Sequence, residues 1–571
     1  MEKQMTELEK LRHSAAHILA QAIKRLYPNV KLGIGPPIED GFYYDFGNLK
    51  INEQDFPKIE AEMNKIVKDN YKFKKIVKTR KEAEKLLKNE PYKLDLLKDL
   101  KKDISFYEDG DFIDLCAGPH VKSTSEVKAF KLLKIAGAYW RGDEKNDMLL
   151  RIYGIAFPSQ KELDEYLKLR EEAEKRDHRK IGKEMELFFF SDLSPGAVFW
   201  QPKGMLIVKE FEKYWREIHD NNGYQEISTQ IVVNYRLFEQ SGHLKHFREN
   251  MFNIKIDNKD FYLKPMNCPE ATLVYSSRLR SYRELPVRLS EIGRLHRNEL
   301  SGVLGGLLRV RQMTMDDAHI FCTEDQILDE VTKVLELIKN FYKIFGFKPS
   351  FFLATRPEKA MGNIKLWKKA EKSLKDALKA NKLDYQIKEK EGAFYGPKID
   401  VHIKDAINRD WQMATIQLDF QMPENFDITY EGKDNKKHRV VMIHRAIFGT
   451  FERFIGILIE HFAGKFPLWI SPVQVIVMNI TEKNEKYASM VVEKLKQNGI
   501  RVEYDNRNDT ISKKVRDAQL MKVNYMITIG DKEEQQNSIA VRTRNGEVKF
   551  NVKLDDFFRD IIKEIQNKEI T

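Results

Sequence analysis

One stretch of sequence indicates the fold of the largest part of the chain: Arg288-Leu-Ser-Glu-Ile-Gly-Arg-Leu-His-Arg297-Asn-Glu299, then Ser301-Gly-Val-Leu-Gly-Gly306, then Leu307-Leu-Arg309-Val-Arg311. Two segments flank a tip rich in glycine and serine, a pattern typical of two strands joined by a loop. Arginines stand at the mouth of this ribbon, where guanidinium groups bind phosphate through paired hydrogen bonds. Basic ribbons are also common as solvated sheet edges, so the pattern alone does not decide between the two.

A second stretch, His444-Arg-Ala-Ile-Phe-Gly449-Thr-Phe-Glu452-Arg453, leads into the apolar run Phe454-Ile-Gly-Ile-Leu-Ile. A glycine turn that enters an apolar helix with an arginine near its start suits a nucleotide, because helix N-termini attract phosphate. No linker is visible between Glu184 and about Trp469. This part of the chain is therefore predicted to be one large α+β domain.

Composition limits the class of protein. At about 150 residues per domain, 571 residues predict roughly three or four domains, and 42% hydrophobic residues exclude disorder of the whole chain. Three cysteines in so long a chain argue against a disulfide scaffold and for a reducing cytoplasm. Neither an apolar leader nor a run of ~20 apolar residues is found, which predicts a protein without a membrane partner. The net charge of +11 permits a polyanionic partner without identifying one.

Flanking regions show two further domains. Thr6-Glu-Leu-Glu9 is a capping box that starts an amphipathic helix, and a mixed α/β module with the strand Phe42-Tyr-Tyr44 continues to about Pro158. Ser159-Gln-Lys-Glu162 starts a charged stretch that ends at Gly182 and is predicted to be a helix between domains. After Pro472 a small α/β domain is predicted, with strands at 473–478, 500–504 and 525–529, helices at 482–497 and from Ile511, a hairpin at Asn545-Gly546 and a last helix from Leu554.

The N-terminal module carries a cluster of chemically active residue types. His13 and His17 lie four residues apart, so both imidazoles point from one face of the first helix. Asp114, Cys116 and His120 follow within one segment bent by Gly-Pro. These residues match a tetrahedral zinc site, and they would equally serve as acid, base and water-orienting groups without metal. Spacing alone leaves both interpretations open.

The order and wording of these motifs resemble a known family. The two stretches quoted first resemble motifs 2 and 3 of class II aminoacyl-tRNA synthetases. The resemblance covers nearly the whole chain, and it implies an antiparallel-sheet catalytic core at 184–470, an α+β editing domain with a helical linker at 1–183 and an α/β anticodon-binding domain at 471–571. Three segments narrow it to the threonyl-tRNA synthetases: Lys264-Pro-Met-Asn-Cys268-Pro269, Met315-Asp-Asp-Ala-His319-Ile-Phe-Cys322 and Gly392-Ala-Phe-Tyr395-Gly396-Pro-Lys398.

The resemblance implies a function and a catalytic site. It implies that ATP with Mg²⁺ activates threonine, which is then transferred to tRNA(Thr), and that Zn²⁺ binds Cys268, His319 and His444. Lys203–Tyr224 resembles the helix of the dimer interface, so a homodimer is expected. The implied catalytic residues are Arg297 for the α-phosphate, Arg453 for the γ-phosphate and adenine, Glu299 for Mg²⁺ or adenine, Arg309, Tyr395, Lys398 and Gln417 for the threonine and phosphate pocket, and His243 as proton acceptor in transfer.

Selection of threonine explains why a second site is expected. Serine lacks only a methyl group of threonine, worth ~1–3 kcal/mol, which is too little for translation. By resemblance, a separate site then hydrolyses seryl-tRNA(Thr) without a bound metal. The implied editing residues are His13, His17, Lys93, Asp114, Cys116 and His120, and the implied anticodon-binding residues are Asn508, Arg516, Glu533 and Arg542, whose side chains can read the exposed edges of unpaired bases.

The sequence departs from the family pattern at several positions. Met315 stands where glutamine is usual in the threonine pocket, Gly305 where histidine is usual in the motif 2 loop, and Gln230 at the motif 1 proline. Cys-Pro-Glu270-Ala271 replaces Cys-Pro-Gly-His. Few residues precede the editing helix, which implies a form without the N-terminal ubiquitin-like domain. These departures keep open a synthetase-like regulator that binds tRNA or RNA without catalysis. A third reading is a metallohydrolase built on the N-terminal cluster.

Overall fold

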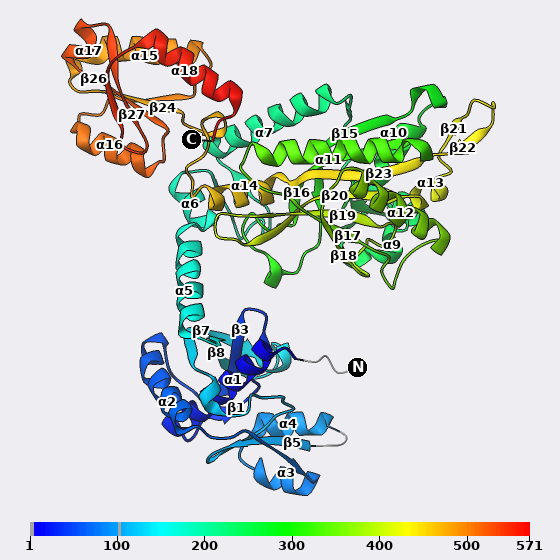
Figure 1. Cartoon of the computed structure of the whole chain (residues 1–571), viewed down its shortest axis with the longest axis vertical. Helices are drawn as coiled ribbons and strands as arrows, with labels where there is room; N and C mark the ends of the chain where they lie inside the picture. Colours follow the sequence, from blue (N-terminus) through cyan, green and yellow to red (C-terminus); the bar gives the residue numbers. More distant parts are fainter. Residues whose placement is uncertain (1–4, 101–103, 571) are drawn as a thin grey trace. The chain divides into compact units, whose positions relative to one another are not determined.

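The computed structural model describes residues 5–100 and 104–570, coloured along the chain in Figure 1. Two compact units divide at Glu172/Ala173. Within the part of the chain that is described, no helix is both long enough and apolar enough to cross a membrane.

The first unit is built on an antiparallel sheet in the order β1-β3-β8-β7, with β2 paired to β3. Helix α1 covers it, and apolar side chains of α1, α2, β3 and β8 form one core that includes Leu19, Phe42, Ile59 and Ile152. The predicted capping box is confirmed, since Thr6 Oγ1 accepts from Glu9 N at 3.2 Å. The elements are α1 (Glu7–Leu26), β1 (Lys31–Leu32), β2 (Pro37–Ile38), β3 (Gly41–Gly47), α2 (Phe56–Asp69), β7 (Ala129–Tyr139) and β8 (Met148–Phe157).

A second, smaller sheet of the first unit carries the segment that the sequence singled out around Cys116. Its order is β4-β5-β6, all antiparallel. Asp114 lies in β6, and the chain then turns through a cis Gly118-Pro119 peptide bond toward His120. The elements are β4 (Lys74–Lys78), α3 (Arg80–Leu86), α4 (Pro91–Asp99), β5 (Ile104–Asp109) and β6 (Phe112–Leu115).

The charged stretch after Ser159 forms two helices, so the prediction of one helix to Gly182 is wrong. Helix α5 (Gln160–Lys175) ends, and α6 (His178–Glu184) starts after Asp177. Asp177 causes the new start, because its side chain accepts from Arg179 N at 2.7 Å and caps α6.

The second unit contains an eight-stranded sheet in the order β11-β15-β16-β23-β20-β19-β17-β18. Pairing is antiparallel except at the two edges, β11–β15 and β17–β18. Helices α7, α11, α12 and α14 bury apolar side chains against it, among them Phe211, Val334, Leu374 and Phe454. The elements are α7 (Pro202–Asn221), β11 (Gln225–Glu226), β15 (Val287–His296), β16 (Gln312–Cys322), α11 (Ile327–Lys343), β17 (Ser350–Ala354), α12 (Ile364–Ala380), β18 (Tyr385–Lys388), β19 (Lys398–Lys404), β20 (Asp410–Asp419), β23 (Val441–Thr450) and α14 (Phe451–His461).

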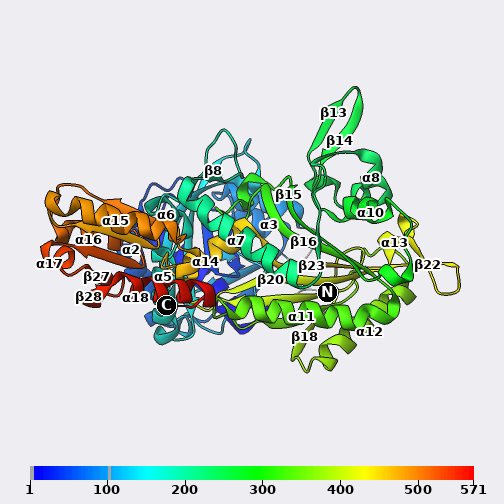
Figure 2. The same ribbon diagram turned by 90° about the horizontal axis from the view of Figure 1, so that it is seen from above.

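Smaller elements surround this sheet. The three-stranded sheet β12-β14-β13 includes the β13–β14 hairpin, which projects from the second unit in Figure 2. The elements are β9 (Phe188–Phe189), β10 (Phe199–Trp200), β12 (Val232–Asn234), α8 (Tyr235–Gln240), α9 (His243–His246), β13 (Asn253–Ile256), β14 (Lys259–Leu263), α10 (Cys268–Ser276), α13 (Gln421–Asn425), β21 (Thr429–Glu431) and β22 (Lys437–Arg439).

The strand–loop–strand prediction is confirmed for the first strand but wrong for the second, because β16 starts only at Gln312. Strands β15 and β16 pair in antiparallel register from Val287↔Phe321 to His296↔Gln312. Residues 297–311 form the loop, which includes Leu307–Arg311, so Arg297, Arg309 and Arg311 lie beyond the strand ends. The glycine turn of the second stretch is also confirmed, since Gly449 has φ +77° at the end of β23 and α14 follows at Phe451.

The C-terminal part is an α/β fold, as predicted. Its sheet has the order β25-β24-β26-β27-β28, parallel through β26 and antiparallel beyond it. Asn545-Gly546 forms the predicted hairpin between β27 and β28. The elements are β24 (Val475–Asn479), α15 (Glu485–Gln497), β25 (Val502–Asp505), α16 (Ile511–Leu520), β26 (Tyr525–Ile529), α17 (Asp531–Gln535), β27 (Ser538–Thr543), β28 (Val548–Lys553) and α18 (Leu554–Asn567).

Candidate functional site

A row of polar side chains crosses the central sheet of the second unit. His319 on β16 lies opposite His444 on β23, His444 opposite Gln417 on β20, and Gln417 opposite Lys398 on β19. Directly paired residues of antiparallel strands share one face, so strand register places these four side chains side by side. The next residues along three of these strands, Ile320, Ile443 and Ile416, point to the apolar core instead.

Cys268 completes a set of three potential metal ligands. It is the first residue of α10, and its Sγ, with one ring nitrogen each of His319 and His444, forms a group within 4.8 Å. Nε2 of His444 lies 3.0 Å from Oδ2 of Asp419, which leaves Nδ1 as the ring nitrogen for a ligand. A carboxylate that orients a ligating imidazole in this way is common at metal sites.

The electrostatics of the three residues suit a cation. Burial lowers the pKa of His319 well below its usual value, so the imidazole is neutral and has a lone pair to donate. Burial raises the pKa of the Cys268 thiol well above its usual value. The thiolate therefore needs a nearby positive charge, which a bound Zn²⁺ would supply. Two imidazoles and one thiolate make a borderline-soft donor set that fits Zn²⁺.

The three potential metal ligands line a cavity of about 690 Å³. Arg297, Arg309 and Arg453 line the same cavity. Arg297 lies at one side, with Nε donating to Pro265 O at 3.2 Å. Arg309 donates to Glu299 Oε2 from Nη2 at 2.8 Å, so Glu299 holds this arginine over the cavity. Further lining residues are Met266, Met315, Asp317, Tyr395, Trp411, Met413, Thr415, Gln417, Phe448, Thr450 and Arg453.

Of the other predicted catalytic residues, some line this cavity and others do not. Tyr395 lines the cavity with its ring 5.1 Å from that of His444, and Gln417 donates to Gly396 O at 3.1 Å. Lys398 instead pairs with Asp400 Oδ2 at 2.7 Å. His243 is fully buried beside Ser241, whose Oγ lies 2.8 Å from Nδ1, and burial lowers the pKa of His243 to about 3. It is therefore a neutral imidazole.

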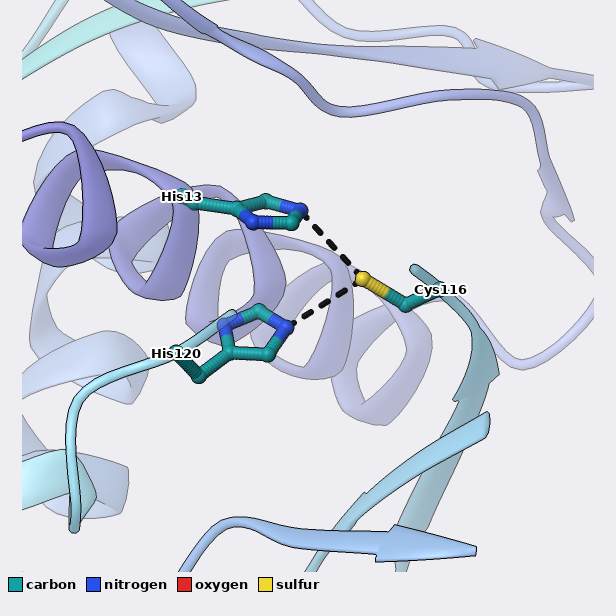
Figure 3. Close-up of side chains that lie close together, drawn as sticks. All are labelled: His13, Cys116 and His120. Atoms are coloured by element: carbon teal, nitrogen blue, oxygen red, sulfur yellow. Dashed lines mark hydrogen bonds between the residues drawn. The ribbon is translucent and has the colours of Figure 1, made fainter. Parts of the chain in front are cut away.

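In the first unit, the predicted editing residues converge on Cys116. Its Sγ lies 3.3 Å from Nε2 of His13 and 3.2 Å from Nε2 of His120, as Figure 3 shows. The two imidazoles stack with their centroids 4.3 Å apart. His17 also lies beside a carboxylate, with Nε2 3.0 Å from Oδ1 of the buried Asp109. The potential metal ligands here thus reduce to His13, Cys116 and His120.

The charges of this cluster are set by burial and hydrogen bonds. Burial alone would raise the pKa of Cys116, but hydrogen bonds from His120, His13 and His17 hold it well below that of a free thiol. Burial opposes a charge on His17, yet hydrogen bonds to Asp109 and Cys116 raise its pKa to about 10. Burial lowers the pKa of His120 to about 4. The Cys116 thiol therefore ionises more readily than a free thiol, while His17 is an imidazolium and His120 a neutral imidazole at neutral pH.

Lys93 and Asp114 are the two remaining predicted editing residues. Nζ of Lys93 lies 2.7 Å from Asp114 Oδ1, and both side chains are buried. Tyr44 OH donates to Asp114 Oδ2 at 2.6 Å. The carboxylate is thus satisfied on both sides, which keeps the lysine ammonium beside the cluster.

The four predicted anticodon residues lie on separate elements of the C-terminal part. Asn508 follows β25, Arg516 lies on α16, Glu533 on α17 and Arg542 on β27; Asn508 and Arg516 are exposed. Arg542 pairs with Met526, whose side chain packs against α16. Arg542 and α16 therefore share one face of this sheet.

Sequence reasoning missed three residues that the structure brings into these sites. Asp317 lines the cavity beside His319 and accepts from Asn267 Nδ2 at 3.0 Å. Asp109 holds His17, and Tyr44 holds Asp114. Asp317 had a signal, because it stands two residues before a predicted zinc ligand in Met315-Asp-Asp-Ala-His319. Asp109 and Tyr44 had no such signal, because each lies far along the chain from the residue that it contacts.

Comparisons with known proteins agree with this geometry. Residues 252–462 match the family described as "tRNA synthetase class II core domain (G, H, P, S and T)", residues 473–564 the "Anticodon binding domain", and residues 104–153 the "Threonyl and Alanyl tRNA synthetase second additional domain". Each match lies inside one of the three domains expected from the sequence.

Individual relatives extend the similarity to nearly the whole chain. The threonine–tRNA ligase of Acetivibrio thermocellus is 55% identical over 98% of this chain and 89% of its own length. That of Clostridium acetobutylicum is 55% identical over 98% and 88%. A solved structure of the RNA binding domain of threonyl-tRNA synthetase from Cryptosporidium parvum Iowa II superposes with a TM-score of 0.66 at 40% identity, covering 68% of this chain and 98% of that one. The chain therefore belongs to the threonine–tRNA ligase family of class II aminoacyl-tRNA synthetases.

Proposed function

We propose that this chain activates threonine with ATP, transfers it to tRNA(Thr), and hydrolyses seryl-tRNA(Thr) at a second site. One observation carries the first part: Cys268, His319 and His444 open into the same cavity as Arg297 and Arg453. A metal-ligand set for an amino acid thus lies beside two cations suited to phosphate.

Threonine selection rests on the metal-ligand set and one carboxylate. Cys268, His319 and His444 would hold Zn²⁺, which would supply a Lewis acid for the amino and β-hydroxyl groups of threonine. Asp317 presents its carboxylate to the same cavity and would accept a hydrogen bond from that hydroxyl. Valine has no hydroxyl and would leave this carboxylate unpaired, so it is rejected strongly.

Activation requires mainly positioning and charge neutralisation. The threonine carboxylate attacks the α-phosphorus of ATP, a bond to the α-phosphate forms, and pyrophosphate leaves with the electron pair of the broken P–O bond. Arg297 would bind the α-phosphate, and Arg453, whose guanidinium lies over the Trp411 ring, would bind the γ-phosphate and adenine. The ion pair between Glu299 and Arg309 would then break. Glu299 would bind Mg²⁺ or adenine, and Arg309 would bind phosphate.

Other cavity residues would hold the adenylate and help its transfer. Tyr395 and Gln417 line the threonine side, and Lys398 would reach the phosphate only by leaving Asp400. The neutral His243 would accept the proton of the tRNA 2′-hydroxyl. Because the side chain of His243 is buried, the residues that cover it would have to move first.

Editing needs only the residues of the first unit. A water held by Cys116 and His13 attacks the carbonyl carbon of the seryl ester, and the bond to the ribose oxygen breaks. That oxygen takes the proton that the water loses. Lys93, fixed by Asp114, and the imidazolium of His17 would stabilise the developing oxyanion, so no metal is required.

The remaining assignments complete the proposal. The domains are 1–183 for editing with its linker, 184–470 for catalysis and 471–571 for anticodon binding. Asn508, Arg516, Glu533 and Arg542 would bind anticodon bases. We further propose a homodimer through α7, one Zn²⁺ per chain, Mg²⁺ with ATP, and a cytoplasmic location, which the reduced, unpaired cysteines support.

The test is threonine-dependent ATP–pyrophosphate exchange together with zinc content. The wild type is expected to contain about one zinc per chain and to exchange, and Cys268→Ala is expected to lose both. Cys322→Ala is the matched control, because this buried cysteine lies outside the cavity. A zinc-replete wild type that binds tRNA without exchange would instead identify a regulatory, non-catalytic relative.

A further inference from the structure

We infer that His178, at the start of α6, is a positioning residue that fixes the motif 2 loop for ATP. The inference rests on the proposed activation of threonine, since ATP is the ligand that this loop would bind. His178 lies in the part of the chain that the sequence assigned to a linker, and its side chain is buried.

Both ring nitrogens of His178 are used. Nε2 accepts a hydrogen bond from the backbone N–H of Leu307, 3.0 Å away in the loop. Nδ1 then carries the proton and donates to Oε1 of Glu460 on α14 at 2.6 Å. Since Leu307 N–H can bond only to an unprotonated Nε2, the contact specifies one neutral tautomer.

Glu460 makes this tautomer stable. Burial would raise its pKa, but the hydrogen bond from His178 and the charge of Arg409 lower it, so the carboxylate is ionised and accepts. The backbone N–H of His178 donates to the same Oε1 at 3.2 Å. The three possible metal ligands at this point, Asp177, His178 and Glu460, are thus engaged by hydrogen bonds and ion pairs.

The loop is built around this contact. Gly306 has φ +54°, and a Cβ there would stand 2.2 Å from Nε2 of His178. Leu307 is fully buried, whereas the next residues, Leu308 and Arg309, line the ATP cavity. One buried hydrogen bond therefore sets the height at which Arg309 enters the cavity.

Two substitutions distinguish the roles of the two hydrogen bonds, because each keeps one bond of His178 and removes the other. In His178→Gln the side-chain oxygen can replace Nε2 and accept from Leu307, and in His178→Asn the amide can replace Nδ1 and donate to Glu460. In pyrophosphate exchange, the KM for ATP should rise about tenfold in His178→Asn and less than twofold in His178→Gln. The KM for threonine should change less than twofold in both, whereas a purely structural role would impair both variants and both substrates alike.

A second measurement needs no variant and no substrate. Amide hydrogen exchange of the full chain should show the Leu307 N–H protected although it lies in a loop, and His178→Gln should retain that protection. Rapid exchange of Leu307 in the wild type, or equal KM effects of the two variants, would overturn the inference. Protection of Leu307 in a protein without pyrophosphate exchange would leave the contact intact and refute only the proposed function.

Discussion

At the scale of single residues, Cys116 is the side chain on which the proposed editing cluster depends. Its thiolate is stabilised by three imidazoles and lies within 3.3 Å of two of them. Cys116 and the residues that surround it belong to the first unit. Its replacement should therefore leave the cavity around Cys268, His319 and His444 unchanged.

Cys116→Ala is therefore expected to slow the hydrolysis of seryl-tRNA(Thr) by about 100-fold or more, the usual contribution of an acid–base group. Threonine-dependent exchange should stay within twofold of the wild type. Deacylation of preformed seryl-tRNA(Thr) measures the first rate. Unchanged deacylation would refute the editing assignment, and Cys322→Ala serves as the control.

The buried pair of His17 and Asp109 predicts a pH dependence of stability. The pKa of His17 is raised to about 10 in the folded state, above its ordinary value of about 6.5. Its contribution to the free energy of unfolding is therefore complete below pH 6.5 and is lost as the pH rises toward 10. The contribution is at most a few kcal/mol.

Thermal unfolding of the first unit checks this sign. Between pH 7 and 9.5 the melting temperature of the wild type should fall more than that of His17→Gln, because only the wild type loses the imidazolium. Other titrating groups are common to both proteins. Equal falls in the two proteins would show that His17 is not charged in the folded state.

At the scale of elements, local signals in the sequence predicted the start of the first helix and the last hairpin turn well. Thr6 and Glu9 cap α1 as expected, and Asn545-Gly546 turns the last hairpin, since caps and tight turns involve only neighbouring residues. The break at Asp177 was missed because the surrounding charge pattern continues across it. A capping aspartate inside a helical pattern was the available signal.

The row of polar side chains across the central sheet could not be predicted in this way. His319, His444 and Gln417 meet through the register of β16, β23 and β20, and more than a hundred residues separate the first from the second. Register depends on packing of the whole sheet, which sequence spacing does not encode. The family resemblance supplied the proposed zinc ligands, but it did not supply Asp109 or His178, whose partners lie far away along the chain.

The motif 2 loop offers a matched pair of glycines for a prediction. Gly306 has φ +54° and no room for a Cβ, whereas a Cβ on the adjacent Gly305 would meet nothing within 4 Å. Gly306→Ala is expected to raise the KM for ATP about tenfold, and Gly305→Ala less than twofold. Steady-state exchange kinetics measure both, and similar values for the two variants would contradict this account of the loop.

At the scale of the whole molecule, function is divided among parts with separate cores. The first unit, the large sheet and the C-terminal sheet each bury their own apolar cluster. The net charge of +11, uninformative by itself, fits a tRNA ligand that the proposed function brings to the editing, catalytic and anticodon-binding parts. Variants in one part are therefore expected to leave the chemistry of another intact.

Arg542→Ala tests this independence. It should raise the KM for tRNA(Thr) in aminoacylation about fivefold to tenfold, because one base-reading group is lost. Pyrophosphate exchange, measured without tRNA, should not change, and neither should the zinc content. An equal loss of exchange would show that Arg542 acts on the catalytic part, against the proposed anticodon role.

The central claim is that the cavity around Cys268, His319 and His444 selects an amino acid that carries a hydroxyl group. ATP–pyrophosphate exchange with threonine, serine and valine, measured side by side on the zinc-replete chain, tests it most directly. The expected order of kcat/KM is threonine first, serine lower by about 10–200-fold, and valine close to background. Valine exchange equal to or faster than serine exchange would contradict the account, because a pocket that selected by shape alone would prefer the isostere.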